Sequence, residues 1–245
     1  MSVTDVVAHS GTKSITNTQT FPTGFTNLYQ FGVAETTAEL KGRTIAWSFW
    51  VYYDPNAAGN NAASDNFSYQ FDTRNTFNEY NSVQSGNVAA STLTGGTWTK
   101  FSGYFRNDPN VVLANGDATL VSAVLNGPTG TFYWDDFASG AVLDGDADLD
   151  GDVDFTDFLA LQANFGSAAT TFVQGNFNYD ATTDFNDFLI LQANFGKSTT
   201  GDTVTVTASD VAAMTAFATT VPEPTTLALA GVGGVMLARR SRKSR

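Results

Sequence analysis

The chain has 245 residues, which is enough for one or two domains with a sizeable core. It contains no cysteine, so a disulfide framework and thiol chemistry are excluded. Its net charge of −12 at pH 7 argues against a nucleic-acid partner, because phosphate binding requires clustered Lys and Arg. Ten of the twenty Asp residues fall between Asp144 and Asp187, a stretch without Lys or Arg, so we expect bound cations to offset their repulsion.

Residues 1–140 have the pattern of a β-sandwich, and the chain as a whole is predicted to be mainly β. In TIAWSFWVYY, which starts at Thr44, residues alternate between an apolar face and a second face that carries Trp50 and Tyr52. Further strands are expected at 96–105, 117–125 and 131–137, because turn-forming Gly, Pro and Asn separate them.

The order of several segments in this region resembles carbohydrate-binding modules of families 4 and 9. These segments are HSGTKSI from His9, GRTIAWSFWVYY, GGTWTKFSGYF and GTFYWDDF. The resemblance implies a jelly roll that binds polysaccharide, and Asp135 and Asp136 resemble the acidic pair that ends such modules. Modules of this family begin with a strand before the position of His9, and residues 1–20 show no apolar signal-peptide core. We therefore expect both the first strand and the signal peptide to lie upstream of Met1.

Aromatic residues on these strands can be core or can stack on a sugar ring. Trp47, Trp98 and Trp134 are predicted to lie in the core. Trp50 and Tyr52 are the candidate carbohydrate-binding residues, with a core role as the alternative. His9, the only histidine, is expected to be an ordinary polar residue near the end of the chain.

Residues 141–197 contain a repeat: DFTDFLALQANFG starts at Asp154 and DFNDFLILQANFG at Asp184. Each copy closes a twelve-residue loop with oxygen-bearing side chains at positions 1, 3, 5, 7, 9 and 12, the spacing of an EF-hand calcium loop. The candidate ligands of the first loop are Asp146, Asp148, Asp150, Asp152, Asp154 and Asp157. Those of the second are Asn176, Asn178, Asp180, Thr182, Asp184 and Asp187. A solvated acidic loop is the alternative interpretation.

The two loops are expected to bind Ca²⁺ with unequal affinity, the first more tightly. The second loop has two neutral Asn ligands, and affinity follows ligand charge. At position 6 the first loop has Gly151, which allows a positive φ, whereas we expect backbone strain at Ala181 in the second. After each loop, apolar residues at helical spacing predict a helix that ends near Gly166 or its equivalent. In the first helix these apolar residues are Phe155, Phe158, Leu159, Ala163 and Phe165.

Two such loops, each followed but not preceded by a helix, resemble the dockerin type I repeat over residues 144–197. The resemblance implies a small all-α, EF-hand-like calcium domain and a cohesin-like partner. Positions 10 and 11 of the loops, which recognise the partner in cellulosomal dockerins, are Phe155 and Thr156, then Phe185 and Asn186. A bulky Phe departs from the small hydroxyl residue that is common there, and this argues against a cellulosomal cohesin.

Residues 198–220 are predicted to form a polar linker, and residues 221–245 a hydrophobic tail with a basic end. The apolar run 227–238 is shorter than the ~20 residues that span a bilayer, which makes a permanent anchor the weaker alternative. The tail, with Pro222, Glu223 and Pro224, resembles the PEP-CTERM sorting signal. This implies removal by an exosortase, transient membrane contact, and export to the envelope, surface or extracellular matrix of a Gram-negative bacterium.

No nucleophile motif, phosphate loop or histidine metal site appears in the sequence, which argues against an enzyme. We expect an exported, non-catalytic, calcium-binding surface or matrix protein that also binds carbohydrate. One alternative is an accessory fragment of a larger polysaccharide-degrading protein, in which case the whole protein could carry a glycoside hydrolase. The other alternative is a purely structural surface protein.

Overall fold

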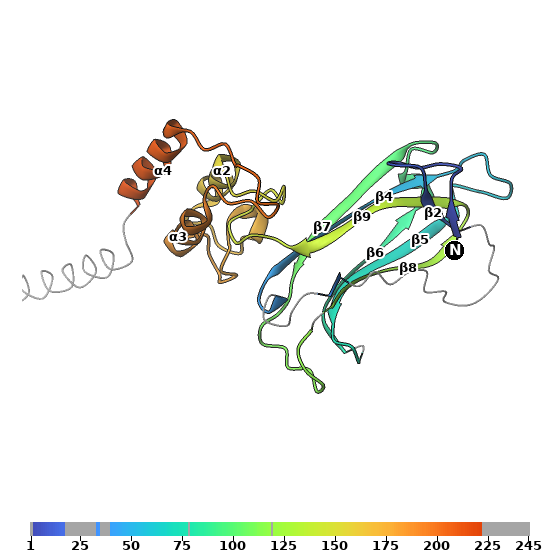
Figure 1. Cartoon of the computed structure of the whole chain (residues 1–245), viewed down its shortest axis with the longest axis horizontal. Helices are drawn as coiled ribbons and strands as arrows, with labels where there is room; N and C mark the ends of the chain where they lie inside the picture. Colours follow the sequence, from blue (N-terminus) through green and yellow to red (C-terminus); the bar gives the residue numbers. More distant parts are fainter. Residues whose placement is uncertain (1, 18–32, 35–39, 78, 119, 222–245) are drawn as a thin grey trace, which may run out of the picture. The chain divides into compact units, whose positions relative to one another are not determined.

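The computed structural model describes residues 2–17, 33–34, 40–77, 79–118 and 120–221. The chain divides between Val142 and Leu143 into two compact units (Figure 1). Among the described residues, the first unit is a two-sheet β-sandwich and the second contains three short α-helices, so the fold is mainly β, as the sequence predicts.

In the described part of the sandwich, a five-stranded sheet faces a four-stranded sheet, and the strand pairs in both are antiparallel. The five-stranded sheet has the order β1 (Ser2–Thr4), β2 (Ser14–Thr16), β9 (Phe132–Ala141), β4 (Thr44–Tyr53) and β7 (Trp98–Arg106). The four-stranded sheet has the order β3 (Val33–Ala34), β8 (Leu120–Thr129), β5 (Asn66–Arg74) and β6 (Tyr80–Ala89), and a short 3₁₀ helix, η1 (Ala90–Thr92), follows β6.

The alternation predicted for β4 is confirmed. Its apolar residues are buried between the sheets: Ile45 packs against Leu40 and Val121. The others pack against aromatic residues of β5 and β9, and they are Trp47, Phe49, Val51 and Tyr53. Trp134 of β9 is buried in the same core, as predicted. The prediction for Trp98 is wrong: it pairs with Tyr52 in register on the outer face, where it is half-buried.

The outer face of the four-stranded sheet contains a buried ion pair. Arg74 donates from Nε to Asp72 Oδ1 at 2.6 Å and from a terminal nitrogen to Oδ2 at 2.7 Å. Asp72 is fully buried and also accepts hydrogen bonds from Gln70 and Ser122. Because every charge in this group has a hydrogen-bonded partner, the cost of burying it is offset locally.

The second unit contains α2 (Phe155–Asn164), a 3₁₀ turn η2 (Phe172–Gln174), α3 (Phe185–Asn194) and α4 (Ala208–Thr220). The first two α-helices follow the two loops, and α2 ends just before Gly166, as predicted. The predicted apolar stripe is wrong at two positions. Leu159, which is 47% exposed, and Ala163 lie off the face that packs inward, whereas Leu161, which the prediction omitted, is buried.

The prediction of a polar linker at 198–220 is wrong in its second half, because residues 208–220 form helix α4. Thr207 begins this helix with a capping box: its hydroxyl accepts from the Asp210 N–H, and the Asp210 carboxylate accepts from the Thr207 N–H. The sequence contained this signal, but Ala and Thr dominate the helix and leave little contrast between its faces.

The predicted tail, with Pro222, Glu223 and Pro224, lies outside the described residues apart from Val221. Within the described part of the chain, no helix is both long and apolar enough to cross a bilayer.

Candidate functional site

Each repeat loop is closed by the carboxylate at position 12. Asp157 Oδ1 accepts from the N–H of Ala147 at 2.7 Å and of Asp148 at 3.2 Å, and its Oδ2 accepts from the Asp154 N–H at 2.7 Å. Asp154 in turn caps α2 by accepting from the Thr156 N–H. One buried carboxylate therefore joins the beginning of the loop to the beginning of the helix.

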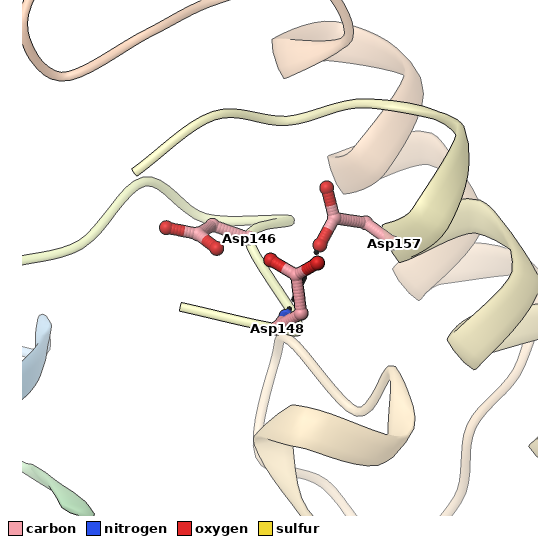
Figure 2. A group of neighbouring side chains, drawn as sticks. All are labelled: Asp146, Asp148 and Asp157. Carbon is pink, nitrogen blue, oxygen red and sulfur yellow. Dashed lines mark hydrogen bonds between the residues drawn. The ribbon is translucent and has the colours of Figure 1, made fainter. Parts of the chain in front are cut away.

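Three predicted ligands of the first loop come together at this point (Figure 2). One carboxylate oxygen from each of Asp146, Asp148 and Asp157 lies within 4.8 Å of the others. Burial raises the pKa of Asp146 to about 7, and also that of Asp157 to about 7, while neighbouring carboxylates add to the rise. Such a group gains from a cation, because a cation removes both the desolvation cost and the repulsion.

Position 1 of each loop holds a buried oxygen without a donor. Asp146 is 0% exposed and Asn176 is 2% exposed. For the Oδ1 atom of each, no hydrogen-bond donor occurs among the described residues. A buried acceptor without a partner costs on the order of 1–3 kcal/mol, more when it is charged. Both oxygens occupy the first liganding position, so the residues fit a bound cation.

The second loop reproduces the hydrogen bonds of the first. Asp187 Oδ1 accepts from the N–H of Phe177 at 2.8 Å and of Asn178 at 3.1 Å, and its Oδ2 accepts from the Asp184 N–H at 2.9 Å. Asn176 donates from Nδ2 to the carbonyl of Asp180 at 3.0 Å, an orientation that leaves its Oδ1 available. The loops therefore share the hydrogen bonds made by the position-12 carboxylate and differ in ligand charge.

The remaining predicted ligands of both loops lie outside the three-carboxylate cluster. In the first loop, Asp150 accepts from the Asp152 N–H, and Asp154 caps α2. In the second, Asp180 accepts from the Thr182 N–H and Asp184 caps α3. These hydrogen bonds stabilise the loops, and each carboxylate keeps further lone pairs that can accept a hydrogen bond or bind a cation.

The strain predicted at Ala181 is not found. Gly151 has a φ of 99°, but Ala181 is not among the residues with positive φ. The left-handed residue common to both loops is instead at position 4, where Leu149 has a φ of 64° and Tyr179 a φ of 59°. Backbone strain at position 6 is therefore no reason for weaker binding by the second loop, and the expected difference in affinity rests on ligand charge.

A second candidate site is the outer face of the five-stranded sheet. Tyr52 lies between two aromatic neighbours, with ring centroids 5.6 Å from Trp98 and 5.9 Å from Tyr133. The predicted sugar platform, Trp50, is stacked under the His9 imidazole at 3.9 Å and 19°, and His9 also meets the edge of Trp98. In this structure the His9 imidazole therefore covers the ring of Trp50 that was predicted to bind a sugar.

The prediction that His9 is an ordinary polar residue is wrong, because the acidic pair on β9 holds it in place. Asp135 accepts from the N–H groups of His9 and Ser10, and His9 Nδ1 lies 2.6 Å from Asp136 Oδ2. Hydrogen bonds from Ser10 and His9 lower the pKa of Asp136. These contacts join residues more than 120 positions apart, and no local pattern in the sequence indicated them.

The comparisons with known proteins concern the two ends of the chain. The PEP-CTERM protein-sorting motif matches residues 220–243. A motif of this kind marks a protein for secretion to the cell envelope and for processing by an exosortase, in line with a Gram-negative bacterium. No curated protein sequence matches this chain.

The structure is similar to carbohydrate-binding modules. The CBM22-1 xylan-binding domain of Paenibacillus barcinonensis Xyn10C has 15% identity and a TM-score of 0.35, with 57% of this chain and 78% of that chain covered. The CBM22-2 xylan-binding domain of the same protein has 19% identity and a TM-score of 0.37, covering 57% and 85%. A CBM4 structure has 13% identity and a TM-score of 0.27, covering 56% and 66%.

Proposed function

We propose that this chain is an exported, non-catalytic protein of the cell envelope or extracellular matrix whose second unit binds two calcium ions. The second unit resembles a dockerin, and its two loops offer oxygen ligands only, which suits a hard cation such as Ca²⁺. The sorting motif at 220–243 supports export. A cohesin partner is not included in the proposal, because Phe155 and Phe185 depart from the usual recognition residues.

The observation that carries the calcium proposal is the pair of buried oxygens at position 1, Asp146 Oδ1 and Asn176 Oδ1. In both loops the Oδ1 atom at position 1 is buried and has no hydrogen-bond donor among the described residues. The first loop surrounds its oxygen with carboxylates, whereas the second has Asn at positions 1 and 3. We therefore expect two calcium sites, the first being the tighter.

Calorimetric titration of the full chain with CaCl₂ tests this proposal. The wild-type chain should give one tight and one weaker site, and Asp146→Ala should remove the tight one. Asp202→Ala is the matched control, because it removes an Asp carboxylate of the same unit that lies outside both loops. Absence of binding heat, or two equal sites that persist in Asp146→Ala, would overturn the proposal.

The first unit supports a second candidate function, which is carbohydrate binding on the outer face of the five-stranded sheet. The specific observation is the aromatic surface of Trp50, Tyr52 and Trp98, on which a flat imidazole already stacks. Sugar rings bind aromatic faces through the same geometry. Because His9 covers Trp50 here, we infer that a glycan must displace His9 or bind beside it.

A further inference from the structure

Helix α4 lies against the repeat pair through one continuous face. The residues of this face that are buried or half-buried recur at helical spacing, and they are Asp210, Ala213, Met214, Phe217, Ala218 and Val221. Val211, on the same helix, is half exposed and lies outside this face. The pattern is that of a helix docked on a surface, not of a free linker.

The surface under α4 is built jointly by the two repeats. The Phe217 ring lies 5.4 Å from Phe158 of α2, 5.6 Å from Phe188 of α3 and 5.0 Å from Phe165 after α2. Phe158 and Phe188 also meet each other edge to face at 6.4 Å. Each of these two residues directly follows the position-12 carboxylate of its loop, so both loops bear directly on the surface that receives Phe217.

A second connection joins the first loop to the segment that leads to α4. After α3 the chain pairs with positions 6 to 8 of the first loop. In this pairing the Val153 N–H donates to the Lys197 carbonyl at 2.9 Å, and the Thr199 N–H donates to the Gly151 carbonyl at 2.8 Å. The hydroxyl of Thr199 also donates to the Gly151 carbonyl. If the first loop became disordered, the segment after α3 would lose these hydrogen bonds, and the aromatic surface under α4 would be lost as well.

The end of α4 coincides with the beginning of the sorting motif. The helix ends at Thr220, the motif match begins there, and Val221 already has an extended backbone with φ −87° and ψ 123°. A proline follows Val221 in the sequence, and the residue before proline disfavours a helical conformation. The docked helix is therefore followed directly by the rest of the sorting motif.

We propose that α4 is a calcium-dependent latch: it docks on the surface of Phe158, Phe165 and Phe188 when the loops hold calcium and leaves that surface when they do not. This inference rests on the proposed calcium binding. Without the cation, the clustered Asp residues repel one another and the two loops lose their closed form. A helix of 13 residues is only marginally stable alone in water, so α4 unfolds when its surface is lost. Calcium binding thereby determines whether α4, which leads into the sorting motif, is docked on the aromatic surface or released from it.

Hydrogen–deuterium exchange of the full chain, measured by mass spectrometry in CaCl₂ and in chelator, tests the latch. Peptides covering 208–220 should exchange on the order of tenfold faster or more in chelator. Peptides from β4 should exchange equally in both conditions and serve as the internal control. Protection of α4 that is unchanged in chelator would overturn the proposal.

Two variants separate the latch from calcium binding itself. Phe217→Ala should free α4 even in calcium, while the calorimetric titration still shows two sites. Val211→Ala, an apolar truncation on the exposed face of the same helix, should leave α4 protected. Two calcium sites together with a protected α4 in Phe217→Ala would refute the latch alone, whereas a chain that binds no calcium would refute both proposals.

Discussion

Gly175 lies against the backbone of Leu161, so closely that a Cβ at Gly175 would be 2.6 Å from the Leu161 Cα. The residue immediately before the second loop therefore packs on the helix that follows the first loop. Gly145, immediately before the first loop, approaches the Leu191 Cα of α3 in the same way, with a Cβ distance of 3.2 Å. The two repeats are interlocked through these contacts, and neither can be complete by itself.

We predict that Gly175→Ala destabilises the second unit by about 2 kcal/mol or more, because the new Cβ meets backbone and φ is 90°. Thermal unfolding in CaCl₂, followed by the helical circular dichroism signal, measures this effect. Gly201→Ala is the matched control, since φ is 76° there and nothing lies within 4 Å of the new Cβ. Equal losses in the two variants would mean that the contact with Leu161 contributes nothing.

The stability of the calcium-free second unit is expected to fall as the pH rises. The pKa values of Asp146 and Asp157 are raised from 3.8 to about 7 in the folded state, so the folded chain binds protons more tightly than the unfolded chain. Their contribution is fully present below pH 4 and is lost as the pH rises through about 7.

In CaCl₂ the sign should reverse, because the cation requires deprotonated ligands. Unfolding of the full chain in chelator and in CaCl₂, recorded by circular dichroism from pH 4 to pH 8, gives both slopes. Asp146→Asn should flatten the slope in chelator, since one of the carboxyl groups with a strongly raised pKa is lost. The same slope with and without calcium would contradict the prediction.

His9→Ala should uncover Trp50 and strengthen retention on a polysaccharide, whereas Trp50→Ala should abolish retention. Affinity electrophoresis against a panel of soluble polysaccharides compares both variants with the wild-type chain. Phe77→Ala, which truncates an aromatic residue that is 66% exposed on the same unit, is the control. If all four proteins migrate alike in every gel, this face is not a glycan site.

Trp50→Ala should also lower stability somewhat. Because Trp50 stacks on His9 instead of facing solvent, its loss removes an aromatic contact worth about 0.5–1.5 kcal/mol. Denaturant unfolding of the same variants therefore distinguishes loss of ligand binding from loss of the fold.

Asp72→Ala should destabilise the sandwich by about 3–5 kcal/mol, because it leaves the buried Arg74 without its carboxylate. Denaturant unfolding followed by tryptophan fluorescence isolates this unit, since all four Trp residues precede residue 143. The control is Asp117→Ala, which breaks an exposed pair with Lys41 at 3.8 Å and should cost at most about 1 kcal/mol. Similar costs for the two variants would show that burial of the Asp72 pair has no energetic consequence.

The sequence by itself determined the features that depend on short spacing. The alternation in β4 identified the buried face, because successive side chains of a strand point to opposite sides. The spacing of oxygen-bearing side chains predicted both loops and the starts of both helices, since the pattern lies within a dozen consecutive residues. The sorting motif is likewise a local pattern, and its match at 220–243 agrees with the prediction.

Only the tertiary structure decided the features that join distant residues. Nothing near His9 in the sequence indicates that Asp135 and Asp136 hold it over Trp50. Helix α4 escaped prediction because Ala and Thr dominate it and leave little contrast between its faces, and its stability comes from Phe217 meeting rings of both repeats. In each case the conformation is selected by contacts that form only after the chain has folded, so spacing along the sequence does not encode it.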